Sequence, residues 1–482
     1  MSSTDESRSA AAEAVHQVMS AAGSVVSEAA EGRWRRAGVI GLSLGVVAAG
    51  AAAGVAVERL TVGRDMRRRA RVEVDAAAPF GSLRGVPRTV TAPDGTELYV
   101  ELDGTGWAGT QFARGGVADP AEPEADSAAP RRGWLGRLRT TTSAAVPPGP
   151  LGGVLSGAVG SWLGRAPTPP LTVVFSHGYC LNQDSWHFQR AAFQDGLRLV
   201  FWDQRSHGRS ERSRSHVAGE PASIDQLGGD LKAVIDAVAP TGPLVLVGHS
   251  MGGMTVMALA DQYPELIRER VAAVALIGTT AGNWKGISLG LPAYSAKMLH
   301  RVAPSVLRAL GRQAELVERT RRLGSDLTSA IYRKFSFGME DVDPAVERFA
   351  QRMLEATPID VVAEFFPAFD LHEKTTALAA FREIPVLVMV GTRDLLTPPV
   401  HSEAIAAELP DAELLVVEGA GHLVMLECPD LVDNRLAVLL EQAAQGSGAP
   451  LPQSVRELAE RPDPTAGSHP PGSDPPYPRE SR

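Results

Sequence analysis

A serine-containing pentapeptide between a buried strand and a helix is the feature that most constrains this chain. Residues 248–252 read Gly-His-Ser-Met-Gly and follow the apolar run 244–247, while residues 253–260 have the composition of a helix. A G-x-S-x-G sequence in this position is typical of a sharp strand-to-helix turn that lifts the serine above the sheet edge. The two glycines leave room where the strand and helix backbones nearly touch. We therefore expect Ser250 to be a candidate nucleophile at the edge of a buried sheet.

An acidic residue and a histidine follow Ser250, each directly after another predicted strand. Asp394 follows the apolar run 386–390, and His422 follows the run 414–417. The carboxyl ends of parallel strands share one edge of a sheet, so the three side chains are expected to converge. Residues 276–282, at the end of another apolar run, contain no Asp or Glu. Asp394 is therefore the predicted acid.

Two further motifs extend this pattern into a family resemblance. Residues 171–179 end in His-Gly-Tyr and resemble a strand with its oxyanion turn, and residues 199–210 resemble a D-x-R-G-x-G-x-S segment in which Ser206 replaces the first glycine. With the order Ser…Asp…His, the chain resembles the α/β-hydrolase superfamily, specifically its cap-bearing serine hydrolases of the esterase and lipase type. The resemblance covers residues 86–445 with one interruption. It implies an α/β-hydrolase fold: a mostly parallel central sheet flanked by helices, with a helical cap inserted after the sixth strand.

The resemblance also assigns chemical roles. Ser250 would attack a carbonyl carbon while His422 accepts its proton, and Asp394 would orient the imidazole. The backbone N–H groups of Tyr179 and Met251 match the family's oxyanion-hole positions. This chemistry requires neither a metal nor an organic cofactor.

The remaining histidines and the charged pair of the second motif are expected to be structural. His249 is predicted to pack under the strand end, and His177 and His207 to organise their loops. Arg205 and Asp203 are expected to form an ion pair or a loop brace. His401, at a predicted helix start, is expected to be exposed.

The overall composition excludes some classes of protein. The chain has 482 residues and a net charge of −9, and its basic residues form no nucleic-acid-binding pattern. Its two cysteines, Cys180 and Cys428, are too few for a disulfide framework. Cys180 follows the oxyanion turn, and Cys428 follows the loop that carries His422, which we call the histidine loop. The two cysteines could therefore lie close together, and the sequence leaves open one disulfide or two free buried thiols. It does not indicate the oligomeric state.

The composition divides the chain into one core and several flanking segments. The expected boundaries are a disordered or loosely helical segment at 1–36, a transmembrane or membrane-associated helix at 37–57, a basic linker at 58–85, the first part of the core at 86–282 with a mostly disordered insert at 107–170, a helical cap at 283–382, the second part of the core at 383–445, and a disordered Pro-rich tail at 446–482. Residues 93–95 are expected to join the two strands of an opening hairpin.

The segment 37–57 contains 21 uncharged residues, enough to cross a bilayer core. Six arginines follow it closely and three precede it, which favours a membrane-associated protein with its catalytic domain in the cytoplasm. A buried or surface-lying helix rich in Gly and Ala is the alternative.

Apolar side chains in the predicted cap are expected to form its own core, and a pocket for a lipophilic substrate is the alternative; they are Leu289, Leu291, Met298, Leu299, Phe335, Phe337, Met339, Phe365, Phe366 and Phe369. The predicted function is hydrolysis of a small-molecule or lipid-like carboxylic ester through an acyl-enzyme. Two alternatives remain open: a ligand-binding or sensing protein that keeps the same fold, and a relative that cleaves C–C or amide bonds or acts like a haloperoxidase.

Overall fold

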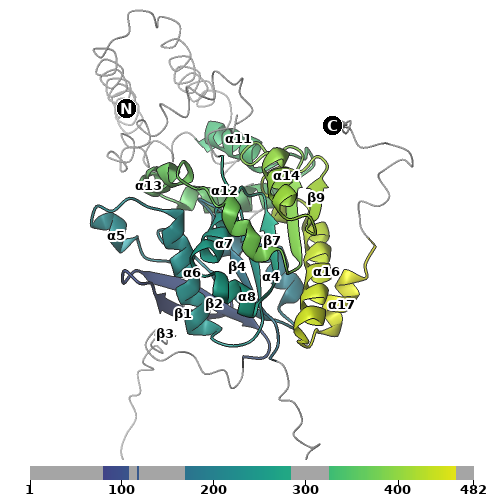
Figure 1. The fold of residues 1–482 in the computed structure, drawn as a ribbon. Helices are drawn as coiled ribbons and strands as arrows, with labels where there is room; N and C mark the ends of the chain where they lie inside the picture. Colours follow the sequence, from purple (N-terminus) through teal and green to yellow (C-terminus); the bar gives the residue numbers. More distant parts are fainter. Residues whose placement is uncertain (1–79, 108–116, 119–168, 284–324, 463–482) are drawn as a thin grey trace, which may run out of the picture.

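A nine-stranded sheet forms the centre of the computed structural model, which describes residues 80–107, 117–118, 169–283 and 325–462 (Figure 1). The strands in chain order are β1 (Val86–Thr91), β2 (Glu97–Gly104), β3 (Val117–Ala118), β4 (Thr172–Ser176), β5 (Arg198–Trp202), β6 (Leu244–His249), β7 (Val271–Ile277), β8 (Val386–Gly391) and β9 (Glu413–Val417). Their order across the sheet is β3-β1-β2-β5-β4-β6-β7-β8-β9. Strands β4 to β9 pair in parallel, whereas β1, β2 and β3 pair antiparallel. The predicted mostly parallel sheet and its opening hairpin are confirmed.

The central strands are buried on both faces because they consist almost entirely of apolar and β-branched residues. Every residue of β4, β6 and β8 is buried. Such continuous apolar runs are typical of parallel strands that helices cover on both sides. Side chains on alternating faces of β4 therefore enter different cores: Val173 and Phe175 one, Val174 the other.

Helices pack on both faces of this sheet. The helices of the described residues, including those of the cap, are η1 (Gln183–Trp186), α4 (His187–Phe193), α5 (Arg214–Val217), α6 (Ile224–Val238), α7 (Met251–Gln262), α8 (Pro264–Arg270), α11 (Ser325–Ser336), α12 (Pro344–Ala356), α13 (Ile359–Phe369), η3 (Thr375–Phe381), α14 (Pro399–Glu408), α15 (Val424–Glu427), α16 (Pro429–Ser447) and α17 (Gln453–Ala459). Side chains of α4, α16 and α17 share one core with the sheet. Side chains of α6, α7, α8, η3 and α14 share the other.

Helices α11, α12 and α13 lie between β7 and β8 in the chain and above the sheet in Figure 1. They fall within the predicted cap at 283–382, which follows the seventh strand and not the sixth because the short strand β3 in the insert was not predicted. They contact the loops that follow two strands: the Thr357 hydroxyl donates to the Cys180 carbonyl, and the Leu423 N–H donates to the Ser336 carbonyl. Of the predicted cap core, Phe337, Phe365 and Phe369 are buried, whereas Leu289, Leu291, Met298 and Leu299 lie outside the described residues.

Two predicted boundaries are wrong. The predicted disordered tail begins at residue 446, yet α17 packs against α16, and Leu451, Val455 and Leu458 are buried in the core. The basic linker was extended to residue 85, yet the Phe80 ring lies 5.7 Å from that of Phe349. Both segments are rich in proline or arginine, and this composition outweighed the few apolar side chains that pack against the core.

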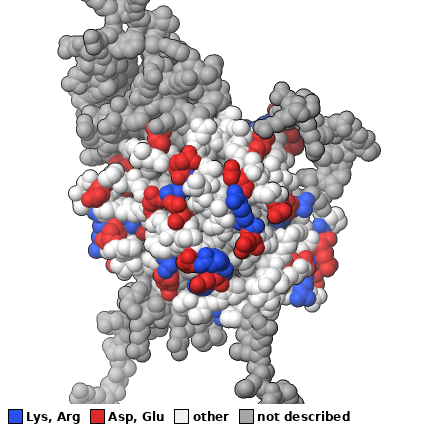
Figure 2. All heavy atoms as spheres, viewed as in Figure 1, with Lys and Arg blue, Asp and Glu red and all other residues white. Residues whose placement is uncertain are grey.

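Several predicted segments lie largely or wholly outside the residues that the structure describes. The segment 37–57 lies outside the described residues, as does the insert at 107–170 apart from residue 107, residues 169–170 and β3, which pairs with β1. Among the described residues, no helix combines the length and apolarity that crossing a bilayer requires. Acidic and basic side chains alternate over the described part of the face shown in Figure 2 and form no continuous basic area there.

Candidate active site

Ser250 occupies a strained turn between β6 and α7. Its backbone has φ 53° and ψ −118°, a conformation that costs a residue other than glycine about 1–3 kcal/mol. The turn is held from both sides, since the Ser250 N–H donates to the Ile277 carbonyl at 2.9 Å and the Thr279 hydroxyl donates to the Ser250 carbonyl at 2.7 Å. These contacts keep the serine at the end of the strand in spite of the strain.

The glycines on either side of Ser250 are required by close backbone approach. A Cβ atom on Gly248 would lie 2.5 Å from the Gly252 carbonyl oxygen, and one on Gly252 would overlap the Ser176 carbonyl oxygen of the neighbouring strand. Both obstructing atoms belong to backbone, so the neighbours have no flexible side chain to move away. The pentapeptide therefore has a local physical reason for each glycine.

Asp394 and His422 are brought into contact at the ends of β8 and β9. The Asp394 Oδ2 atom lies 2.8 Å from the His422 Nδ1 atom, and both side chains are buried. Asp394 is fixed in turn by the N–H groups of Leu396 and Thr397, each 2.8 Å from Oδ1, and by the Thr397 hydroxyl, 2.9 Å from Oδ2. A hydrogen bond from Nδ1–H to the carboxylate leaves the Nε2 lone pair of His422 available to accept a proton.

Ser250 and His422 are neighbours through His249. The His249 Nε2 atom lies 2.9 Å from the His422 carbonyl oxygen, and the two imidazole rings are 4.8 Å apart. Within the described residues, the Ser250 hydroxyl makes no hydrogen bond. The structure therefore joins Asp394 to His422 and places Ser250 beside them, without a hydrogen bond from serine to histidine. Such bonds are often long in ligand-free sites.

The turn after β4 packs directly against the strand-to-helix turn at residues 248–252, the nucleophile elbow. A Cβ atom on Gly178 would lie 3.2 Å from the Ser250 Cβ atom and 2.7 Å from His249 Nδ1. Within the described part of the chain, neither the Tyr179 N–H nor the Met251 N–H has a hydrogen-bond acceptor. Two unsatisfied backbone donors beside a serine hydroxyl are the arrangement that stabilises an oxyanion.

Buried histidines around the site hold loops and remain neutral. Burial lowers the pKa of His177 to about 3 and that of His207 to about 4, and it lowers the pKa of His249 well below its ordinary value. His177 accepts a hydrogen bond from the Gln204 N–H at 2.9 Å, which joins the loops after β4 and β5. His401 was predicted to be exposed and is instead buried, with Nδ1 2.9 Å from the Thr280 hydroxyl.

The second motif braces loops through separate partners. Arg205 does not pair with Asp203; it binds Asp94 at 2.8 Å and Asp230 at 2.5 Å. Asp203 accepts hydrogen bonds from the N–H groups of Gln183 and Arg209, both at 2.8 Å. The loop-brace alternative is therefore correct for both residues, and the direct ion pair is not formed.

Ser206, the departure from the family motif, adopts φ +65°. This left-handed conformation favours glycine and explains why glycine is usual there. The Ser206 hydroxyl donates to Glu364 of α13 at 3.1 Å and accepts from the Ser213 N–H at 3.0 Å. The substitution thus adds a contact between the core and the cap.

Sequence reasoning missed two residues that support the site. Thr397 lies three residues after Asp394, a spacing at which a side chain commonly closes a turn, so a local signal existed. Glu427 accepts hydrogen bonds from the N–H groups of Gly338, Met339 and Gly421 at 2.7, 2.5 and 2.7 Å. No local pattern indicates this role, because two of the donors are almost ninety residues away.

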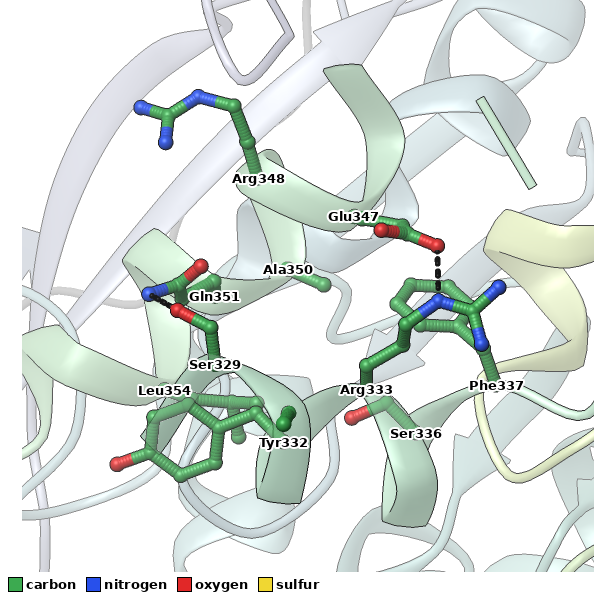
Figure 3. Close-up of a pocket in the computed structure, with 11 residues that line it drawn as sticks. Ser329, Tyr332, Arg333, Ser336, Phe337, Glu347, Arg348, Ala350, Gln351 and Leu354 are labelled. Carbon is green, nitrogen blue, oxygen red and sulfur yellow. Dashed lines mark hydrogen bonds and ion pairs between the residues drawn. The ribbon is translucent and has the colours of Figure 1, made fainter. Parts of the chain in front are cut away.

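A cavity of about 160 Å³ lies between α11 and α12 (Figure 3). Arg333 and Glu347 form an ion pair at 2.6 Å within its lining, and Gln351 donates to Ser329 at 2.7 Å. Ser336, also in the lining, contacts the histidine loop through its carbonyl group, but none of the predicted site residues lines the cavity. We therefore assign this cavity to the cap.

Neither cysteine forms a disulfide; Cys180 and Cys428 are both free and half-buried. The described residues contain no group of three or more His, Cys, Asp or Glu side chains arranged to hold a metal ion.

Comparison with known proteins found one matching family model and several similar proteins. A model of the Alpha/beta hydrolase family matches residues 173–435. A proline iminopeptidase, PfmaB, of Pestalotiopsis fici is 27% identical over 285 residues, which cover 57% of this chain and 92% of that protein. A monoacylglycerol lipase of Mycolicibacterium smegmatis is 28% identical over 273 residues, 54% of this chain and 83% of that protein. The solved structure of a thermophilic esterase from Thermogutta terrifontis is 23% identical, with a TM-score of 0.48 over 75% of this chain and 99% of that chain.

Proposed function

The chain belongs to the Alpha/beta hydrolase family, and from that premise we propose that it is a serine hydrolase that cleaves a carboxylic ester. The observation that carries the proposal is the contact between Asp394 and His422 beside a serine in a strained turn. A hydroxyl group is a weak nucleophile unless a neighbouring base removes its proton. His422, with its Nδ1 bonded to a carboxylate, is the neighbouring group best placed to act as that base.

The proposed reaction has two halves. The Ser250 oxygen attacks the ester carbonyl carbon while His422 Nε2 takes the hydroxyl proton, and the resulting oxyanion is stabilised by the N–H groups of Tyr179 and Met251. The intermediate collapses, the C–O bond to the alcohol breaks, and His422 returns the proton to the departing oxygen. Water then attacks the acyl-enzyme by the same route and releases the carboxylic acid and Ser250.

For the substrate, we propose a lipid-like ester with an apolar acyl group. Two independent features support this class. One relative is named a monoacylglycerol lipase, and the sequence predicts a membrane-associated segment at 37–57 with the catalytic domain on the cytoplasmic side. A profile of activity against p-nitrophenyl esters of increasing acyl length would test it; a preference for acetyl over octanoyl esters contradicts the lipid-like class but not the ester hydrolase.

A labelling experiment tests the enzyme itself. We expect a fluorophosphonate probe to modify the full-length chain at Ser250 and p-nitrophenyl butyrate to be hydrolysed, with both signals absent in Ser250→Ala. Ser213→Ala, which removes a buried hydroxyl away from the turn, is the matched control and should keep both signals. Absence of labelling and hydrolysis in folded wild-type protein would contradict the proposal.

A second candidate is a ligand-binding or sensing protein on the same fold. The described residues show no hydrogen bond from the Ser250 hydroxyl to His422, a geometry that such a protein shares with a resting hydrolase, and the labelling experiment distinguishes the two. Amide cleavage is a third candidate, since another relative is named a proline iminopeptidase. Aminoacyl p-nitroanilides, offered beside the esters, distinguish it from ester hydrolysis.

A further inference from the structure

The turn that carries the Tyr179 N–H has a strained backbone. It is closed by a hydrogen bond of 3.2 Å from the Leu181 N–H to the Gly178 carbonyl, so Tyr179 and Cys180 are its two central residues. Cys180 has φ +60°, in the left-handed region that turns normally fill with Gly or Asn. A residue in such a conformation persists only where its surroundings hold it.

The surroundings that hold this turn come from the cap. The Tyr179 hydroxyl donates to the Val362 carbonyl of α13 at 2.5 Å, and the Thr357 hydroxyl donates to the Cys180 carbonyl at 3.1 Å. The Tyr179 ring also packs edge-on against Phe369, with ring centroids 5.0 Å apart. Burial, with the nearby Cys180 thiol and Glu364 carboxyl, raises the pKa of Tyr179 well above its ordinary value, so its hydroxyl remains a donor. Both central residues of the turn are therefore tied to residues 357–362.

Helix α13 has its own attachment to the core, independent of this turn. Glu364 accepts from the Ser206 hydroxyl and pairs with Arg212, both at 3.1 Å, and Arg212 also pairs with Asp360 at 3.0 Å. We therefore expect α13 to keep its position on the core when a single hydrogen bond to the turn is removed. Removing one of the two hydroxyl groups therefore takes one hydrogen bond from the turn and leaves the attachment of α13 to the core in place.

We propose that the cap segment 357–362 positions the oxyanion turn, with the hydroxyl groups of Tyr179 and Thr357 as the positioning groups. This inference rests on the proposed ester hydrolysis. Its consequence is specific: because the oxyanion forms only after attack, loosening the turn lowers kcat and leaves substrate binding nearly unchanged. A cap that acted only as a wall of the binding pocket would instead change KM.

The test compares Tyr179→Phe, Thr357→Val and Thr357→Ser in the full-length chain, with kcat and KM measured on p-nitrophenyl butyrate. We expect Tyr179→Phe and Thr357→Val each to lower kcat about tenfold, less than deletion of an oxyanion donor, with KM changed by less than about threefold. Thr357→Ser keeps the hydroxyl and should retain at least half of kcat. Tyr99→Phe is the matched control, because its hydroxyl binds Glu101 at 2.9 Å on β2, away from α13, and its kcat should be unchanged.

Three results would contradict a positioning role for the cap segment. An increase in KM at constant kcat, equal losses in Thr357→Ser and Thr357→Val, or variants indistinguishable from Tyr99→Phe would overturn the positioning role while leaving ester hydrolysis intact. If Tyr179→Phe fails to fold, the two Thr357 variants give the answer. A wild-type chain that neither hydrolyses esters nor labels at Ser250 overturns the proposed function, and the positioning role with it.

Discussion

The Asp394 carboxylate contacts His422 Nδ1 with one oxygen, Oδ2, and accepts two backbone N–H groups with the other, Oδ1. Because the two oxygens have different partners, Asp394→Asn tests whether His422 depends on the negative oxygen at Nδ1. The backbone donors of Leu396 and Thr397 would keep the amide oxygen, so the amide NH₂ group would face His422. His422 would then have to accept at Nδ1 and carry its proton on Nε2, where it cannot take the proton of Ser250.

We therefore expect Asp394→Asn to lower kcat for p-nitrophenyl butyrate about 10³–10⁴-fold, the scale of a wrong histidine tautomer. The unfolding midpoint in urea should change little, because all donors to the carboxylate oxygens keep an acceptor or face another polar atom. Asp411→Asn, at an exposed position, is the control. A loss of less than tenfold in Asp394→Asn would show that His422 does not depend on this carboxylate.

Two glycine substitutions test whether the backbone around the Ser250 turn is as closely packed as its geometry indicates. Gly252→Ala would bring a methyl group onto the Ser176 carbonyl oxygen, and we expect it to lower the free energy of unfolding by about 3 kcal/mol or more. Gly229→Ala, inside α6 with no heavy atom within 4 Å of the new methyl group, should raise it by about 0.5–1 kcal/mol. Urea unfolding measures both; similar small effects for the two variants would contradict the close approach.

Much of this architecture could be predicted because its signals are local. The elbow, the hairpin turn at 93–95 and the runs that end at Asp394 and His422 each lie within a dozen residues of sequence. Leu451, Val455 and Leu458 also have helical spacing, and the surrounding prolines obscured it.

What could not be predicted depends on distant partners. His401 is buried and has a polar partner in the Thr280 hydroxyl, 121 residues away in the chain. Ser206 replaces a glycine at a left-handed position, and its contact with Glu364 joins residues 158 apart. The sequence shows each of these residues but not its partner, because tertiary contacts override local preference.

Glu427 gives a third prediction. Its carboxylate accepts three backbone N–H groups, and one of them belongs to Gly421, the residue before His422. Glu427→Gln supplies only one acceptor oxygen, so at least one donor is left unsatisfied. We expect the free energy of unfolding to fall by about 1–3 kcal/mol and kcat to fall with it. Exposed Glu418→Gln serves as the control; equal urea midpoints for the two variants would remove Glu427 from the support of the histidine loop.

The predicted membrane segment is tested by fractionation. We expect the full-length chain to sediment with membranes and a chain lacking residues 1–60 to remain in the supernatant, because residues 37–57 supply the apolar surface and the following arginines bind anionic lipid. Replacing Arg64, Arg67, Arg68 and Arg69 by Gln removes the binding to anionic lipid and leaves the apolar segment 37–57, so it separates the electrostatic contribution from the apolar one. A full-length chain found in the supernatant at both low and high salt would contradict membrane association.

Asp433 gives a prediction about pH. Burial raises the pKa of this α16 carboxyl to about 7, with a smaller contribution from Asp430, in spite of a hydrogen bond of 2.8 Å from Gln189. Between the ordinary value of 3.8 and about 7, the folded chain binds a proton that the unfolded chain does not, so this group's contribution to stability falls as pH rises through that window.

Asp433→Asn keeps the acceptor for Gln189 and binds no proton. Relative to wild type, its free energy of unfolding should therefore rise by about 2–4 kcal/mol between pH 4 and pH 8. Urea unfolding at several pH values measures this difference. Asp195→Asn, at an exposed position, should show no such trend, and a flat difference for Asp433→Asn would mean that the carboxyl is already ionised in the folded chain at pH 4.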